Sequence, residues 1–161
     1  MGTLRRVNSR AGPSQMLRRA REVEAGVVHA LLWSAKDDIP LVEAFQTDPY
    51  YREWVADRCK QKVVWVVTEK RKIIGTMVMR GTEIFYLAVS AEHRRKGVAR
   101  MLVRKAKALC RERGVTAKAV PGNIPVARLL VAEGFRCDGV MPGLPGSITQ
   151  SWIGYSYIAS G

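Results

Sequence analysis

The stretch EIFYLAVSAEHRRKGVAR, residues 83–100, joins an apolar segment to a basic loop and the start of an amphipathic one. Residues 84–89 are apolar at both parities, which predicts a strand buried on both faces. The apolar period becomes helical over 97–113, and Gly114 is expected to close that helix. A buried strand, a glycine-containing loop and a helix in this order indicate an α/β protein, in which ligands bind at the carboxyl ends of strands.

The basic loop predicts an anion site. Arg94, Arg95 and Lys96 directly precede the expected helix. The first N–H groups of a helix lack intrahelical partners, and the helix dipole adds positive potential there. Gly97 allows close approach to the backbone, and Ala99 keeps the first turn slim. These features favour a phosphate-bearing ligand; a solvated basic loop with an ordinary glycine is the alternative.

The remaining elements follow from apolar periodicity, caps and turn residues. The predicted strands are 16–20, 63–67, 73–79, 83–90, 115–120, 136–141 and 152–158. The predicted helices are 22–34, a second that Asp48-Pro49 caps and that buries Tyr51, Trp54 and Val55, 97–113, and a fourth that Asn123 opens and Gly134 ends.

Composition excludes several classes of protein. A chain of 161 residues is the size of one domain and can bury about two thirds of its unfolded surface without a disulfide or metal. Its apolar runs are shorter than the roughly 18 residues of a membrane span. The three cysteines, Cys59, Cys110 and Cys137, lack C-x-x-C spacing, which argues against a zinc ribbon and favours a reducing compartment. With two histidines, no metal site is expected.

The chain is strongly basic. Its 27 Lys and Arg against 14 Asp and Glu give a net charge of +13, which attracts nucleic acid, acidic proteins or a phosphorylated cofactor. Residues 1–21 contain arginines and no acid, a composition that resembles a mitochondrial transit peptide but lacks a clear apolar face. We expect one domain over 15–161. Ahead of it, we expect residues 1–14 to form a flexible basic extension, whether or not it belongs to the natural protein. We expect a cytoplasmic protein, with a mitochondrial location as the alternative.

Residues 83–135 resemble the core of the GNAT superfamily, the acetyl-CoA-dependent N-acetyltransferases. Arg94, Gly97 and Ala99 match the family signature Q/R-x-x-G-x-G/A, which follows a strand and opens a helix. The segment from Asn123 to Gly134-Phe135 resembles the family's closing helix. The resemblance implies an α/β fold with a mixed, mostly antiparallel sheet of six to seven strands flanked by about four helices.

The resemblance also implies where acetyl-CoA, the acetyl donor, would bind. Its pyrophosphate would lie on the loop and first helical turn, and its pantetheine arm beside strand 83–90. A bulge in this strand and its divergence from the next would open a slot for the thioester, whose carbonyl the N–H near Leu87 would polarise. A plain helix cap is the alternative role for Asn123. The implied cofactor-binding residues are Leu87, Ala88, Val89, Arg94, Arg95, Lys96, Gly97, Val98, Ala99, Arg100 and Asn123.

The resemblance implies one catalytic residue and leaves a second role to be filled by another group. Glu83 is similar to the glutamate with which the histone-acetyltransferase branch accepts the amine proton; an exposed carboxylate at a turn is the alternative. Leu130 stands where the family often carries a tyrosine as general acid, so Tyr155, Tyr157 or water would have to substitute. A glutamate of the ribosomal-protein branch would fall near Lys118, so that branch's base is absent.

The acceptor is left open by the sequence. The family's acceptor pocket corresponds to 34–46 and 142–151, where Asp37 and Asp38 would attract a cationic amine. A protein lysine or N-terminus, a polyamine or an aminoglycoside-like drug all fit. Arg100, Arg104, Lys107 and Arg111 share one face of the long helix, which would either meet the 3′-phosphate of coenzyme A or be solvated.

The function expected is direct transfer of acetyl to a primary amine in a ternary complex, on a small-molecule or protein acceptor. We expect no specific nucleic acid and no membrane partner, and leave a homodimer open. A catalytically degenerate acyl-CoA sensor and a basic nucleic-acid-associated module are the alternatives. Thiol release with an amine panel separates enzyme from sensor, and the salt dependence of nucleic-acid binding tests the third.

Overall fold

The computed structural model describes residues 14–38, 48–142 and 151–159, which form a seven-stranded sheet of order β1-β2-β3-β4-β5-β7-β6. Neighbouring strands in the described sheet are antiparallel except β4 and β5, which are parallel. This confirms the predicted mixed, mostly antiparallel fold. The strands are β1 (Gln15–Arg19), β2 (Val64–Glu69), β3 (Lys72–Arg80), β4 (Glu83–Val89), β5 (Val115–Ala119), β6 (Arg136–Pro142) and β7 (Ser151–Tyr157).

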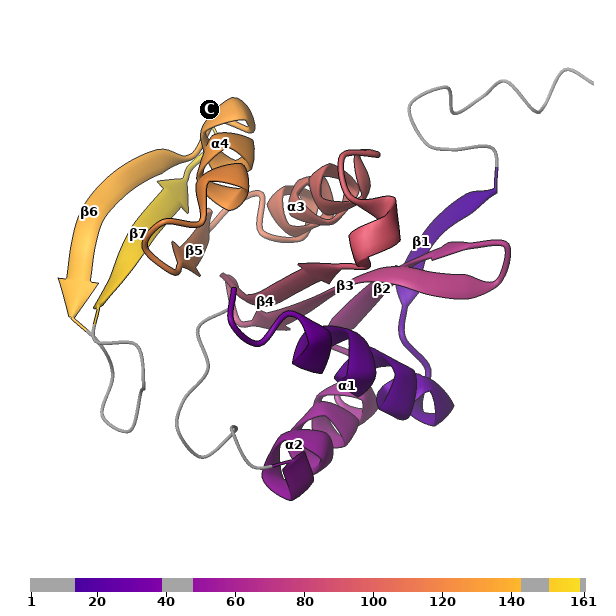
Figure 1. The fold of residues 1–161 in the computed structure, drawn as a ribbon. Helices are drawn as coiled ribbons and strands as arrows, with labels where there is room; N and C mark the ends of the chain where they lie inside the picture. The colour runs from indigo at the N-terminus through magenta and orange to yellow at the C-terminus, as the bar shows by residue number, and fades with distance from the viewer. Residues whose placement is uncertain (1–13, 39–47, 143–150, 160–161) are drawn as a thin grey trace, which may run out of the picture.

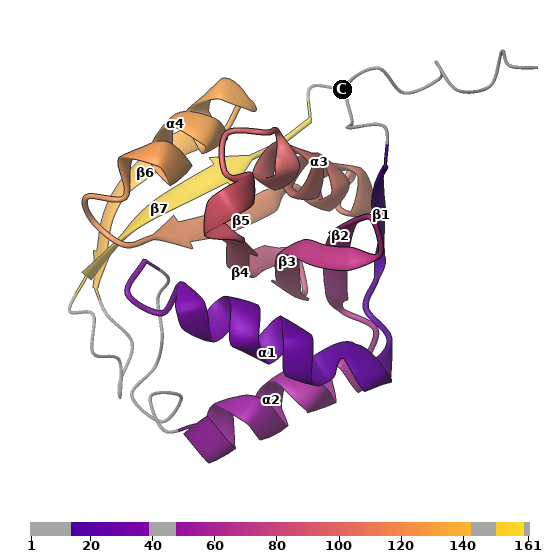
Figure 2. The ribbon, with the colours of Figure 1, turned by 45° about the vertical axis from the view of Figure 1, so that its right-hand side comes forward.

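Helices cover both faces of this sheet. Figures 1 and 2 show α1 and α2 against one face and α3 and α4 against the other. The helices are the 3-10 turn η2 (Glu22–Glu24), α1 (Ala25–Ser34), α2 (Asp48–Lys60), the 3-10 turn η4 (Ala91–His93), α3 (Val98–Leu109) and α4 (Ile124–Ala132). In the described part of the chain, no helix combines the length and apolar character needed to cross a membrane.

Each face has its own apolar core. Leu102 and Val103 of α3 pack with Ile74 and Met77 of β3, and all four are fully buried. On the other face, Tyr51 and Val55 pack under the sheet as predicted, whereas Trp54 is half-buried. Burying one large apolar side chain contributes about 1.5–3 kcal/mol, so the two cores fix the helices on the sheet.

A β-bulge interrupts β4 at Phe85. Val78 of β3 pairs with Tyr86 and Met79 pairs with Ile84, which leaves Phe85 without a partner on β3. Ile84 therefore faces the α3 core, while Tyr86 lies in the core under α1 and α2. β4 is therefore buried on both faces, as predicted, with buried side chains alternating with half-buried ones along the strand.

Helix α3 ends four residues earlier than predicted. It stops at Leu109, and 110–113 form a turn that Gly114 closes with a hydrogen bond from its N–H to the Cys110 carbonyl, 2.9 Å. Arg111, Glu112 and Arg113 are exposed and offer no apolar side chain to the sheet, so packing does not support another helical turn. The cap on α2 involves the side chain of Asp48, which lies outside the described side chains.

Candidate active site

Strands β4 and β5 separate soon after they meet. They pair at Glu83 with Thr116 and at Ile84 with Ala117, and in Figure 1 β5 then turns away from β4. The Ser90 N–H donates to Ile74 on β3, 2.8 Å. By the alternation of an antiparallel ladder, Leu87 and Val89 direct their N–H and C=O groups away from β3, into the gap. The expected bulge, divergence and open edge are thus all present.

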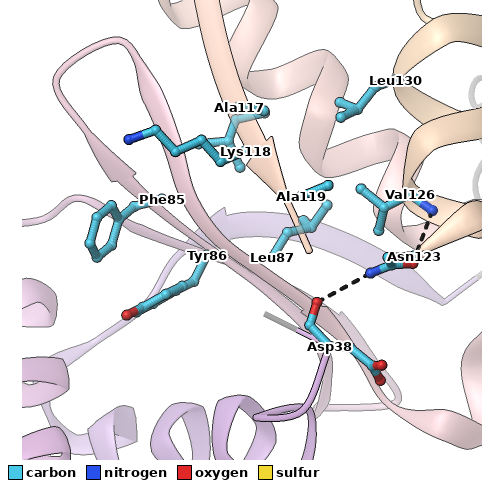
Figure 3. A pocket seen from close by; sticks show the side chains of 11 residues that line it. Asp38, Phe85, Tyr86, Leu87, Ala117, Lys118, Ala119, Asn123, Val126 and Leu130 are labelled. Carbon is cyan, nitrogen blue, oxygen red and sulfur yellow. Dashed lines mark hydrogen bonds between the residues drawn. The ribbon is translucent and has the colours of Figure 1, made fainter. Parts of the chain in front are cut away.

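A cavity of about 40 Å³ lies in this gap, bounded by Leu87 of β4, Ala119 of β5 and Val126 of α4 (Figure 3). A water needs roughly 10–15 Å³ of such space, so the cavity holds a few waters. Leu130 also lines the cavity and is buried, so this position faces the gap and brings no hydroxyl to it.

Asn123 spans one side of the cavity. Its side-chain oxygen accepts a hydrogen bond from the Val126 N–H at the start of α4, 3.4 Å. Its amide donates to the backbone carbonyl of Asp38, just beyond α1, at 3.2 Å (Figure 3). The helix-capping role is therefore present, and the amide also ties the end of α1 to α4 beside the gap.

The loop between β4 and α3 has the backbone geometry of an anion site. Gly97 is the N-cap of α3 with φ 79°, and Arg95 also has a positive φ of 64°. No side chain caps the helix, and the Met101 N–H makes the first helical bond, to the Gly97 carbonyl at 3.0 Å. A Cβ on Gly97 would meet nothing within 4 Å, so the space beside it is open to a ligand. Val98 is buried against β3, while Ala99 is half-buried.

The three cations of this loop are exposed and make no ion pair with the described acids. Next to them, the His93 Nε2 lies 3.1 Å from a Glu69 carboxylate oxygen, which fastens η4 to the end of β2. On the other side, Gly75 of β3 lets α3 pack closely, because a Cβ there would lie 2.5 Å from Val98 Cγ1. Arg94, Arg95 and Lys96 thus project from an anchored backbone.

The basic face of α3 is mostly engaged by one acid. Arg100, Arg104 and Lys107 all converge on Glu133, whose side chain is 5% exposed, at 3.4, 3.0 and 3.5 Å. Lys107 also donates to the Glu133 carbonyl, 2.7 Å. Burial alone would raise the pKa of Glu133, but the hydrogen bonds and charges of Arg104 and Lys107 outweigh it and lower that pKa. Sequence reasoning missed Glu133, because a single acid near the end of α4 gives no local signal.

Glu83, the expected base, is held between two cations. Its Oε1 accepts from Arg80 Nη2 at 2.9 Å, and its Oε2 lies 3.2 Å from Lys118 Nζ. The guanidinium of Arg80 also lies over the Phe85 ring, 4.4 Å from its centroid. Glu83 does not itself line the cavity, whereas Lys118 does. The family resemblance placed Lys118 near the position where the ribosomal-protein branch carries a glutamate. Sequence reasoning missed the pairing of Lys118 with Glu83.

Tyr155 and Tyr157 lie on β7, outside the cavity lining. Tyr155 is buried in the α3 core, and burial raises its pKa. Tyr157 packs against Phe135, and Lys107 Nζ lies over its ring at 4.4 Å. The structure therefore gives both tyrosines packing contacts. Ala88, also expected at the cofactor site, lies in the core under α1 and α2, between Leu87 and Val89 of β4.

Aromatic side chains lie on the side of the cavity where the acceptor is expected. Phe85 and Tyr86 of β4 line the cavity, and both pack against Trp54 of α2. The Tyr86 hydroxyl is buried without a hydrogen-bond partner among the described residues. Asp38 also lines the cavity. The rest of the expected acceptor segments, 39–46 and 143–150, lies outside the described residues. In the described part, no group of acids, histidines and cysteines can hold a metal.

An open strand edge beside an uncapped, cationic helix start fits an extended ligand that carries phosphates at one end. The open space at Gly97 and the unpaired loop cations lie at the phosphate end of such a ligand, and the β4 edge lies along its length.

Comparison with known proteins identifies the family. Residues 28–135 match the sequence model of the acetyltransferase (GNAT) family, and the chain belongs to this family. The family uses acetyl-CoA, and the chain is an acetyltransferase-family enzyme. Comparison with curated protein sequences yields no match.

Solved structures share the fold at low sequence identity. Ard1 from Thermoplasma volcanium has a TM-score of 0.71 at 19% identity, over 92% of this chain and 99% of that one. The ribosomal-protein-alanine N-acetyltransferase from Brucella melitensis has 0.69 at 20%, over 89% and 99%. The putative acetyltransferase yncA from Salmonella typhimurium, solved with acetyl-CoA, has 0.66 at 16%, over 91% and 95%.

Proposed function

We propose that this enzyme transfers the acetyl group of acetyl-CoA to a primary amine by direct attack in a ternary complex. The observation that carries the proposal is the divergence of β4 and β5 after Ile84 and Ala117, directly beside the uncapped start of α3. In a family enzyme, this arrangement would present the edge of β4 to the donor, beside the cavity at which the acceptor would react.

The donor site consists of the loop and the β4 edge. Arg94, Arg95 and Lys96 supply positive charge, and the backbone N–H groups from Arg95 to Arg100 supply donors for phosphate oxygens. The side chain of Arg100 is shared with Glu133, so its contribution is mainly its N–H. Leu87 and Val89 offer N–H and C=O groups to the pantetheine amides. When bound, acetyl-CoA supplies the activated acyl group as a thioester.

Two groups on β4 serve the reaction. The Leu87 N–H points into the gap and would stabilise the developing negative charge on the acyl oxygen. Glu83 would accept the proton that the amine must lose, because a lysine-like amine with a pKa near 10.4 is mostly protonated at neutral pH. Its contacts with Arg80 and Lys118 require a substrate ammonium to compete with two cations.

Protonation of the departing thiolate does not depend on a tyrosine. Leu130 faces the gap, and Tyr155 and Tyr157 are engaged in packing. A thiol with a pKa near 8.5 leaves adequately with water as the proton source. We therefore favour water over Tyr155 or Tyr157 as the acid.

The proposal is tested by a screen of primary amines in which free thiol reports transfer. Single amino acids, polyamines, aminoglycosides and peptides with free N-termini or lysines are each offered with acetyl-CoA. Thiol release that depends on one acceptor class supports the enzyme. Acetyl-CoA binding with no release for any class would instead establish a sensor, which the absent hydroxyl at Leu130 favours.

A further inference from the structure

Lys118 is the only primary amine among the side chains that line the cavity between β4 and β5 in the described residues. Val115, Ala117 and Ala119 of β5 point into the α3 core, so the alternate residue Lys118 points to the opposite face. Glu83 reaches the same ammonium from β4. Figure 3 shows Lys118 extending from β5 toward β4.

We propose that Lys118 is an internal acetyl acceptor, which the enzyme acetylates in its own active site. The proposal rests on the proposed function, since it requires a thioester in this gap. Lys118 Nζ lies 3.2 Å from the carboxylate proposed to accept the amine proton, and the side chain is 24% exposed. An amine held on a side chain that lines the cavity is at a high effective concentration there compared with an external amine.

The reaction balances without a further reactant. The Lys118 nitrogen bonds to the acetyl carbonyl carbon as the carbon–sulfur bond breaks. Of the two protons that the ammonium loses, one protonates the released thiolate and the other passes through Glu83 to solvent. The products are N-acetyl-Lys118 and coenzyme A.

Acetylation changes the environment of Glu83. It removes the charge of Lys118 and with it one of the two ion pairs of Glu83, while Arg80 still donates to Oε1 at 2.9 Å. The carboxylate therefore does not become an unpaired charge in a half-buried position. A single internal acetylation would leave Glu83 with one cationic partner, so an external ammonium would compete with one cation instead of two.

The test incubates the full chain with acetyl-CoA and no added amine, followed by intact mass and peptide mapping. We expect one acetyl group at Lys118 and one equivalent of thiol. Lys107 is the internal control, since it is 22% exposed and also pairs with a carboxylate, but lies outside the cavity. Lys118 should react at least about tenfold faster than Lys107. Lys118→Arg, which keeps the charge, should lose the modification.

Three results would overturn the inference. One is acetylation of Lys118 no faster than that of Lys107, and another is an equal rate in urea-unfolded protein, since both indicate chemical acetylation. The third is turnover of an external amine with Lys118 left unmodified, which leaves the proposed function intact. Absence of thiol release with every amine, together with an unmodified Lys118, would overturn both proposals.

Discussion

The Arg104 guanidinium donates two hydrogen bonds to the Glu133 carboxylate, from Nε to Oε1 at 3.0 Å and from Nη2 to Oε2 at 3.2 Å. This contact joins the middle of α3 to the C-terminal end of α4. It places a large part of the basic face of α3 in a structural role, because Arg100 and Lys107 bind the same carboxylate. Near the start of α3, the described cations that stay available for a ligand are Arg94, Arg95 and Lys96.

Removal of the Glu133 charge should destabilise the fold. Glu133→Gln leaves three cations around a neutral amide, and we expect a loss on the order of 1–3 kcal/mol in the free energy of unfolding. Urea denaturation measures it. The control is Asp138→Asn, since Asp138 pairs with the exposed Arg136 and should change stability by less than about 0.5 kcal/mol. Equal effects of the two substitutions on the free energy of unfolding would contradict the proposed role of Glu133 in joining α3 to α4.

Gly97→Asp should abolish acetyl-CoA binding, with a loss of at least about 100-fold in affinity measured by calorimetry. The new carboxylate would stand in the open space where phosphate is expected, and a β-carbon is strained at φ 79°. Gly139→Asp is the matched control, since Gly139 also has positive φ and open surroundings but lies on β6. Unchanged affinity in the Gly97 variant would remove the loop from the donor site.

Glu83→Gln should lower turnover by roughly 10²–10⁴ while acetyl-CoA affinity stays nearly constant. The remaining rate should rise with pH, because the acceptor amine then loses its proton without assistance. Glu112→Gln, at an exposed acid beyond α3, should leave turnover unchanged. Steady-state thiol release over a range of pH measures both. A wild-type rate in the Glu83 variant at neutral pH would assign the proton transfer to solvent or another group.

Glu24 should make stability depend on pH in acid. Hydrogen bonds from Arg18, at 2.8 and 2.7 Å, and from the Arg21 N–H lower the Glu24 pKa to about 2. A lowered carboxyl pKa stabilises the fold above its ordinary value near 4.5, and this stabilisation is lost as pH falls toward 2.

Wild type should therefore exceed Glu24→Gln by on the order of 1–3 kcal/mol at pH 7, and the difference should shrink between about pH 5 and 2. Urea denaturation at several pH values measures the difference. Glu22→Gln, at the exposed neighbour, should show no comparable dependence. A pH-independent gap between wild type and Glu24→Gln would show that the charge of Glu24 is not responsible.

The net charge should give only weak attraction to nucleic acid. Affinity for duplex DNA or RNA should fall steeply between low and physiological salt, as counterion release requires, and fluorescence anisotropy measures it. Deletion of residues 1–14 should weaken this binding and leave acetyl-CoA affinity and turnover of a small amine little changed. Tight, sequence-selective binding at physiological salt that coenzyme A displaces would instead make the basic surface a docking site.

The sequence by itself determined the helices and strands and located the basic loop before α3. Periodicity located the strands and helices, and Gly97 after three cations predicted an anion-binding helix start, where the structure has φ 79°. Asn123 before Pro125 predicted the cap of α4. These features depend on residues a few positions apart, so a local pattern is sufficient to reveal them.

The tertiary structure alone decided which side chains meet at the site. The pairing of Glu83 with Lys118 joins residues on two strands, and the contact of Arg104 with Glu133 joins two helices. The bulge at Phe85 depends on the register between β3 and β4, and its exact place is not visible in the apolar run of β4. Each of these contacts depends on how the elements pack, because residues distant in the chain meet only after the sheet and both helical layers have formed.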